Sequence, residues 1–155
     1  MRSSLLRYKF YNARSYGQAY GRLLAMKLTE DHPEPFDLIT WVPISRLRRF
    51  RRGYDQVELL AHAVGKELGR SPSSLLKKIR NTPPQSTIRD AAKRRANVLG
   101  AYRVTDPALI EGKHILLLDD VLTTGATASE CAKTLMIAGA KSVYFAAIAA
   151  ASHKS

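Results

Sequence analysis

Residues 115–127 read ILLLDDVLTTGAT, and this stretch indicates both the fold and the site more directly than any other part of the chain. Its first four residues, Ile115 to Leu118, predict a buried strand, and two carboxylates, Asp119 and Asp120, follow at the predicted strand end. A hydroxyl-rich turn then leads into a helical pattern. The unpaired N–H groups and positive dipole end of a helix start attract phosphate, while carboxylates bind sugar hydroxyls. The stretch therefore predicts a sugar-phosphate site, with an ordinary capped strand and helix as the simpler alternative.

The rest of the chain alternates predicted helices and strands around this stretch. Helices are predicted at 15–28, 54–68, 89–97 and 124–138, and strands at 37–42, 75–79, 101–104, 114–118 and 142–149. Such alternation predicts an α/β fold with a mainly parallel central sheet flanked by helices. Ligands of such sheets bind at the carboxyl ends of the strands. The loop that begins at Pro43 and the loop that begins at Asp119 are therefore expected at one rim.

The composition is that of one globular domain with an anionic partner. The 155 residues are 45% hydrophobic and 25% charged, which excludes a disordered chain. The formal net charge is +12, and it lies before residue 115, because three lysines are balanced by three acidic residues beyond that point. A strongly basic half predicts binding to pyrophosphate or to nucleic acid.

The cysteine count and the hydropathy pattern narrow the class of protein further. Cys131 is the only cysteine, so the sequence offers no internal disulfide and no zinc-ligand cluster. We interpret it as a small buried residue on the apolar face of its helix. No apolar run is long enough to cross a bilayer, and the first ten residues contain no signal-peptide region. These features predict a cytoplasmic protein without a membrane partner.

A basic segment directly follows the predicted strand 37–42. Residues 44–53 read ISRLRRFRRG and contain five arginines, while Phe50 and Tyr54 place aromatic rings among and after them. Guanidinium groups bind phosphate oxygens through paired hydrogen bonds, so this loop is a candidate pyrophosphate site. Interleaved aromatic rings would also suit stacking on single-stranded nucleic acid, and a plain solvated surface is the third alternative.

The central stretch resembles the motif of the type I phosphoribosyltransferases, which bind 5-phosphoribosyl-1-pyrophosphate (PRPP). Further motifs are similar to the ComF/GntX branch of that family, which is often described as amidophosphoribosyltransferase-like. These motifs are Trp41-Val42-Pro43, Arg52-Gly53-Tyr54-Asp55-Gln56 before Leu59-Leu60-Ala61, Arg80-Asn81-Thr82, Pro84-Gln85, Arg94-Arg95-Ala96-Asn97-Val98 and Gly100-Ala101-Tyr102. Together with the central stretch they cover residues 37 to 149. Asp55 departs from the branch, which usually has Asn at this place.

The resemblance implies a role for each segment of the site. Asp119 and Asp120 would face the ribose hydroxyls and favour the positive charge that develops at the anomeric carbon. The loop around the 5′-phosphate would comprise Val121, Leu122, Thr123, Thr124, Gly125, Ala126 and Thr127. The pyrophosphate loop would comprise Pro43, Ile44, Ser45, Arg46 and Arg52.

The segment from Arg80 to Asn97 is expected to form a small mobile lid that excludes water during transfer. Four basic residues in it are candidates to close on pyrophosphate: Arg89, Lys93, Arg94 and Arg95. The alternative is an exposed linker whose basic residues have no part in the chemistry.

By this resemblance the protein is expected to transfer a 5-phosphoribosyl group from PRPP to an unidentified nitrogen nucleophile and to release pyrophosphate. Mg²⁺ would bind together with PRPP, near Asp119 and Asp120, and no other metal site is implied. One alternative is a competence accessory protein that binds single-stranded DNA and retains the PRPP site. Another is a PRPP sensor without turnover.

Domain organisation is expected to be simple. Residues 1–36 would form a helical segment packed on the core, residues 37–151 the phosphoribosyltransferase domain, and residues 152–155 a short tail. The ComF/GntX branch commonly carries a four-cysteine zinc module before this domain. This sequence lacks those cysteines, so no zinc site is carried over, and whether such a module precedes residue 1 is left open. A homodimer is also left open.

Overall fold

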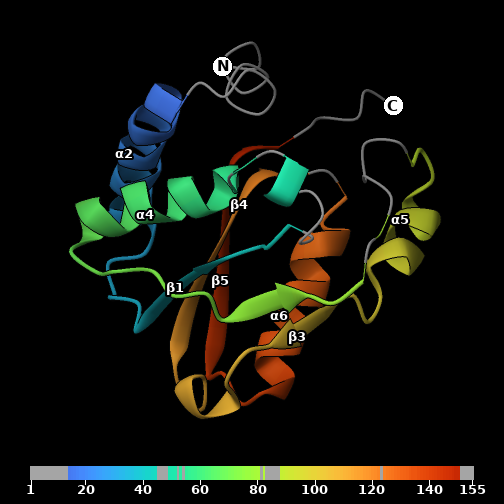
Figure 1. Cartoon of the computed structure of the whole chain (residues 1–155). Helices are drawn as coiled ribbons and strands as arrows, with labels where there is room; N and C mark the ends of the chain where they lie inside the picture. Colours follow the sequence, from blue (N-terminus) through green and yellow to red (C-terminus); the bar gives the residue numbers. More distant parts are fainter. Residues whose placement is uncertain are drawn as a thin grey trace.

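Three parallel strands form the centre of the structure, a computed structural model that describes residues 14–44, 49–51, 53, 55–80, 82, 88–122 and 124–150. They are β1 (Leu38–Trp41), β4 (His114–Leu122) and β5 (Ser142–Ala150), in the order β1-β4-β5 (Figure 1). The register pairs Leu38 with Ile115 and Leu118 with Ala146. The predicted α/β fold with a mainly parallel central sheet is confirmed.

The two faces of β4 build two separate hydrophobic clusters. Leu116 and Leu118 pack with α2 (Arg14–Asp31) and α4 (Gln56–Leu68), while Ile115 and Leu117 pack with α6 (Ala126–Ile137). Successive strand residues point to opposite faces, so an uninterrupted apolar run requires helices on both sides. The helices therefore form a layer on each face of the sheet, with β4 buried between them.

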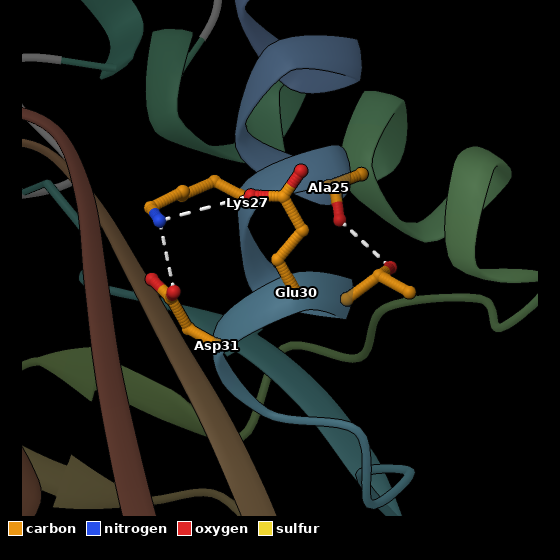
Figure 2. A network of polar contacts seen from close by, with 5 residues as sticks. Ala25, Lys27, Glu30 and Asp31 are labelled. Atoms are coloured by element: carbon orange, nitrogen blue, oxygen red, sulfur yellow. Dashed lines mark hydrogen bonds and ion pairs between the residues drawn. The ribbon is translucent and has the colours of Figure 1, made fainter.

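The helix α2 packs against α4 at a glycine. A Cβ atom built at Gly21 would lie 2.4 Å from the Cβ of Ala63, so only glycine allows this approach. At the exposed end of α2, Lys27 contacts Glu30 at 3.7 Å and Asp31 at 2.9 Å (Figure 2). These surface ion pairs contribute little to the stability of α2, which comes mainly from the packing of the helix against the rest of the fold.

Two short antiparallel strands, β2 (Leu76–Lys78) and β3 (Tyr102–Val104), form a ribbon beside the central sheet, and α5 (Ala91–Val98) lies in the segment between them. Ser73 donates its backbone N–H to the Ile39 carbonyl at 2.8 Å, which attaches the ribbon to β1. Arg80 donates to the carbonyls of Asn97 at 3.0 Å and Leu99 at 2.8 Å. The guanidinium of Arg80 thus joins the two ends of the segment predicted as a lid.

The central strand is longer than the sequence indicated. We predicted that it would end at Leu118, but β4 continues to Leu122, because β5 is equally long and pairs with it to its last residue. The helix was predicted to start at residue 124, but α6 starts at Ala126. Gly125 precedes it with φ 78°, a left-handed conformation that separates the turn from the helix. The acidic pair therefore lies within the strand and not beyond it.

No helix among the described residues is long and apolar enough to cross a membrane. A short 3₁₀ helix, η2 (Pro107–Leu109), precedes β4. The tail 152–155 and the first 13 residues lie outside the described residues.

Candidate functional site

The site is built where β1 ends at Trp41, beside Leu118 of β4, while β4 itself continues to Leu122. Val42 donates its backbone N–H to the Leu118 carbonyl at 2.9 Å, which continues the parallel pairing beyond Trp41. Pro43 then leaves β1 beside the place where β4 carries Asp119. The loop after β1 and the acidic pair of β4 consequently lie at the same rim of the sheet, the place where such sheets bind ligands, although the second predicted loop does not begin at Asp119 but after Leu122.

The acidic pair is held by its own backbone. The Asp119 carboxylate accepts from the Asp120 N–H at 2.8 Å, and the Asp120 carboxylate accepts from the Val121 N–H at 2.8 Å. Asp120 is only 8% exposed, and Asp119 is partly buried. Both side chains are therefore fixed by a rigid strand, as precise binding of a sugar requires.

The predicted 5′-phosphate loop is not all loop: Val121 and Leu122 belong to the end of β4, and Ala126 and Thr127 belong to the start of α6. Thr123 lies outside the described residues. The Thr124 hydroxyl accepts from the Ala126 N–H at 3.4 Å, a long hydrogen bond, and Gly125 has no side chain with which to cap α6. The N–H groups of this first helical turn point out of the helix end, as a phosphate site requires. The side chains of Val121 and Leu122 on β4 and of Thr127 on α6 are partly buried, as is Gly125 between them.

Cys131 of α6 is fully buried, as predicted. Burial is the main reason that the pKa of its thiol lies well above the ordinary value, and the nearby charges of Asp119 and Glu130 raise that pKa further. A buried protonated thiol is a poor nucleophile, so Cys131 serves as a packing residue.

The predicted pyrophosphate loop is described only in part. Pro43 and Ile44 are partly buried at the end of β1, whereas Ser45, Arg46 and Arg52 lie outside the described residues. Arg49 lies farther along this loop, and its guanidinium contacts the Glu58 carboxylate of α4 at 2.9 Å. The arginine run is therefore partly tied to the helix that follows it.

Asp55 directly follows this loop and begins α4. Its side chain, 3% exposed, caps α4 by accepting from the N–H groups of Val57 at 2.9 Å and Glu58 at 3.2 Å. Burial raises the pKa of the Asp55 carboxyl, although hydrogen bonds from the backbone N–H groups of Glu58, Val57 and Ile44 oppose the change. An Asp directly before a helix pattern is the sequence signal that predicts such a cap.

A cavity of about 420 Å³ opens beside this loop. Its wall comes from the end of β1, the loop, the start of α4 and the β2–β3 ribbon, and contains Trp41, Pro43, Ile44, Arg49, Asp55, Ser74, Leu76, Lys77, Lys78, Ile79 and Arg103. Four of these side chains are cationic and one is a carboxylate, so the wall favours an anion. Lys77, Lys78 and Arg103 were not predicted as site residues. The sequence places them on strands far from the motif, and only the fold brings them to the loop.

A larger hollow, of about 720 Å³, lies between α2 and α4. It is lined by none of the residues predicted for the site. Volume alone therefore does not identify the functional surface, and the convergence of charged groups at the strand ends is the better guide.

The basic residues of the predicted lid differ in their exposure to solvent. Arg89 and Lys93 are exposed, whereas Arg94 is 7% exposed and its Nε donates to the Ile88 carbonyl. Asp90 caps α5, and the hydrogen bond from the Lys93 N–H lowers the pKa of its carboxyl. Arg94 thus holds the start of α5 in this structure, and Arg89 and Lys93 face solvent. Figure 1 shows α5 beside α6.

No cluster of three or more His, Cys, Asp or Glu side chains suited to a metal occurs among the described residues. The acidic pair offers oxygen ligands of the kind that Mg²⁺ prefers, and Mg²⁺ commonly completes its shell with substrate oxygens and water. The residues present therefore fit a magnesium ion that binds with a phosphorylated substrate.

A parallel sheet whose central strand carries an acidic pair, followed by a glycine turn and a helix, is the arrangement expected of a phosphoribosyltransferase fold. The family model for the phosphoribosyl transferase domain matches residues 60–155, and the chain belongs to this family.

Relatives support the resemblance to the ComF branch. The chain is 35% identical over 108 residues to the DNA utilization protein YhgH of Salmonella typhi, which covers 69% of this chain and 46% of the relative. It is 29% identical over 144 residues to competence protein F of Haemophilus influenzae, which covers 88% and 62%. It is 33% identical over 146 residues to competence protein ComFC of Streptococcus pneumoniae, which covers 92% and 60%. The chain thus spans less than two thirds of these relatives.

Solved structures support the fold. The glutamine PRPP amidotransferase of B. subtilis aligns with a TM-score of 0.59 at 21% identity, over 87% of this chain and 26% of that one. The PRPP synthetase of Mycobacterium smegmatis aligns with a TM-score of 0.53 at 25% identity, over 84% and 33%.

Proposed function

We propose that this protein binds PRPP together with Mg²⁺ and transfers the 5-phosphoribosyl group to a nitrogen nucleophile. The observation that supports this most strongly is the arrangement of the rim, where the acidic pair of β4 stands next to the loop that leaves β1 at Pro43. Membership of the phosphoribosyl transferase domain family supports it independently. The acceptor is a small nitrogen compound that neither the family nor the fold identifies.

In this proposal each side of the rim binds one part of PRPP. The turn at Gly125 and the first turn of α6, at the end of the predicted stretch from Val121 to Thr127, bind the 5′-phosphate with backbone N–H groups. Asp119 and Asp120 accept hydrogen bonds from the ribose hydroxyls. The loop that begins at Pro43 and the cationic wall of the 420 Å³ cavity bind the pyrophosphate.

The transfer breaks the bond between the anomeric carbon and the pyrophosphate oxygen, and pyrophosphate leaves with the electron pair. The acceptor nitrogen supplies the pair for the new C–N bond and loses a proton. The carboxylates of Asp119 and Asp120 stabilise the positive charge on the ribose, and the cationic wall stabilises the departing negative charge. Bound Mg²⁺ supplies further neutralisation of the pyrophosphate. When PRPP binds, the segment 80–99, tied at its base by Arg80, would close over the site and exclude water, and Arg89 and Lys93 would then contact pyrophosphate.

Thermal unfolding tests the binding step. PRPP with Mg²⁺ is expected to raise the melting temperature, since a ligand that binds only the folded state stabilises it. Catalysis is then tested by pyrophosphate release, measured over time with ammonia and a panel of nitrogen bases. Release that depends on an acceptor supports a transferase, whereas binding without release favours the sensor. Absence of any shift with PRPP would contradict the proposal.

A second candidate function is binding of single-stranded DNA at the arginine run. Phe50 is 87% exposed and lies between the exposed Arg49 and Arg51, an arrangement that suits stacking of a base beside phosphate contacts. Relatives bear the names DNA utilization protein and competence protein. Replacing Phe50 and Arg51 by alanine should weaken salt-sensitive binding of a single strand. Lys133→Ala with Lys141→Ala, which removes two exposed lysines from the other half of the chain, is the matched control. A wild-type protein with no affinity for single strands at low salt rules this function out.

A further inference from the structure

The cationic cavity of about 420 Å³ contains two basic residues that lie opposite each other in the β2–β3 ribbon. The register pairs Lys77 of β2 with Arg103 of β3, and both residues are exposed. Like charges at directly opposite positions of an antiparallel pair destabilise it. Among the described residues no carboxylate forms an ion pair with Lys77 or Arg103. The pair therefore offers its positive charge to an anion from outside the protein.

The other two cations of the cavity wall have contacts within the protein. The guanidinium of Arg49 contacts the Glu58 carboxylate of α4 at 2.9 Å. The Nζ atom of Lys78 lies 5.8 Å from the centroid of the Tyr102 ring. The ion pair with α4 holds Arg49 at the cavity wall, on the side that belongs to the arginine run.

Phe50 stands at the edge of the same cavity. It directly follows Arg49, and consecutive Cα atoms are only about 3.8 Å apart. Its side chain is 87% exposed, so the ring is available for stacking. An exposed ring at the edge of a cationic cavity suits a single-stranded nucleic acid, with a base on the ring and a backbone phosphate on the cations.

We infer that PRPP and a single-stranded nucleic acid compete for the cationic cavity, so that each ligand lowers the affinity of the protein for the other. The inference rests on the proposed function, because it assigns the diphosphate of PRPP and a phosphate of the strand to the same cations. Two polyanions at one cavity repel each other and require the same counter-charge. The coupling is reciprocal: a bound strand keeps PRPP out, and PRPP releases the strand.

Ribose 5-phosphate distinguishes competition at the cavity from a general effect of charge. It has the sugar and the 5′-phosphate of PRPP but lacks the diphosphate. In the proposed function these parts bind at the acidic pair of β4 and at the start of α6. No described residue of β4 or α6 lines the cationic cavity, so ribose 5-phosphate should leave a bound strand in place.

The test measures the binding of a fluorescently labelled oligothymidylate of about 16 nucleotides by anisotropy. PRPP, pyrophosphate or ribose 5-phosphate is added at constant free Mg²⁺ and constant ionic strength, because salt alone weakens the binding of a strand. Saturating PRPP or pyrophosphate should raise the apparent Kd of the strand about tenfold, and ribose 5-phosphate should not change it. Calorimetry with PRPP, in the presence and absence of the unlabelled strand, should show the same factor.

Variants divide the cavity into a shared part and a part specific to nucleic acid. Lys77→Ala with Arg103→Ala should weaken the binding of both PRPP and the strand, because both ligands use these cations. Phe50→Ala should weaken the strand about tenfold and leave PRPP unchanged, because only a base stacks on the ring. Lys133→Ala with Lys141→Ala, which removes two exposed lysines beyond β4, is the matched control and should change neither affinity.

The outcomes separate failure of the inference from failure of the proposed function. A folded wild type that does not bind PRPP overturns the proposed function. A wild type that binds PRPP but no strand overturns the inference and leaves the transferase proposal standing. If both ligands bind, equal displacement by PRPP and ribose 5-phosphate, or displacement by neither, shows that they do not share the cavity.

Discussion

At the amino end of β1 and β4, Asp37 and His114 bind each other twice: the Asp37 N–H donates to the His114 carbonyl at 2.9 Å, and the His114 N–H donates to the Asp37 carboxylate at 2.8 Å. At the carboxyl end, Asp55 likewise accepts backbone N–H groups, but it does so in the wall of a cationic cavity. The chemistry is the same at both ends. The difference is that Asp37 joins the two strands at their amino end, whereas Asp55 caps α4 in a cavity wall that contains four cationic side chains and therefore favours an anion.

The largest expected effect comes from the acidic pair. Asp119→Asn with Asp120→Asn should lower PRPP affinity about a hundredfold, because both negative charges are lost and each side chain keeps only one neutral acceptor oxygen. Calorimetry or thermal shift with PRPP and Mg²⁺ measures it. Asp37→Asn, at the other end of β4, should leave the affinity unchanged. If Asp37→Asn lowered PRPP affinity as much as the double change at Asp119 and Asp120, the two ends of the strands would not differ in ligand binding.

The turn at Gly125 should show the next largest effect. Gly125→Ala has space, since the nearest atom to a new Cβ is 3.8 Å away, but φ 78° disfavours any side chain. We expect a loss of about 1 kcal/mol in the free energy of unfolding, together with weaker PRPP binding. Gly69→Ala, with φ 69° and open space at the far end of α4, should cost similar stability without changing PRPP affinity. If both variants bind PRPP equally well, the turn does not hold the phosphate.

The cavity wall should show a smaller effect that depends on salt. Lys77→Ala with Arg103→Ala removes two of the four cations and should weaken binding of Mg²⁺–pyrophosphate about fivefold at low ionic strength. Lys133→Ala, on the exposed side of α6, is the control. Titration at two salt concentrations measures the effect, and weakening that is independent of salt would argue against a direct charge contribution.

The smallest expected effect concerns stability as a function of pH. The contributions of Asp37, at the amino end of the strands, and of Asp55, at the carboxyl end, should change in opposite directions as pH rises. The hydrogen bond from His114 lowers the pKa of the Asp37 carboxyl, so its stabilisation is present above about pH 4 and is lost as pH falls through the folded-state pKa. Burial and nearby Glu58 raise the pKa of Asp55, so the folded state binds its proton more tightly than the unfolded state. That carboxyl favours folding at low pH and loses this contribution as pH rises through the raised pKa.

Denaturant titrations of Asp37→Asn and Asp55→Asn between about pH 3 and 7 measure how the free energy of unfolding of each variant changes with pH. Relative to the wild type, Asp37→Asn should lose stability as pH rises, and Asp55→Asn should gain it. Parallel curves for the two variants would show that the ends of the sheet do not differ in this way.

Local pattern predicted most of the fold. The apolar run Ile115 to Leu118, flanked by carboxylates and a glycine-containing turn, was enough to predict a buried parallel strand and the helix after it. The local sequence pattern did not predict that β4 continues to Leu122. Asp119 and Asp120 were interpreted as the end of the strand, but pairing with β5 extends β4 beyond them. It also assigned Arg94 to the surface of a lid, where the structure has it buried against Ile88.

The sequence by itself determined the order of strands and helices and the acidic pair at the central strand, because periodicity and charge are properties of neighbouring residues. It also determined that the loop after β1 is basic. Only the tertiary structure decided that Lys77 and Arg103 line the same cavity as Pro43 and Asp55. These contacts join segments that lie far apart along the chain or across a turned loop, and no local propensity encodes which distant groups will meet when the sheet forms.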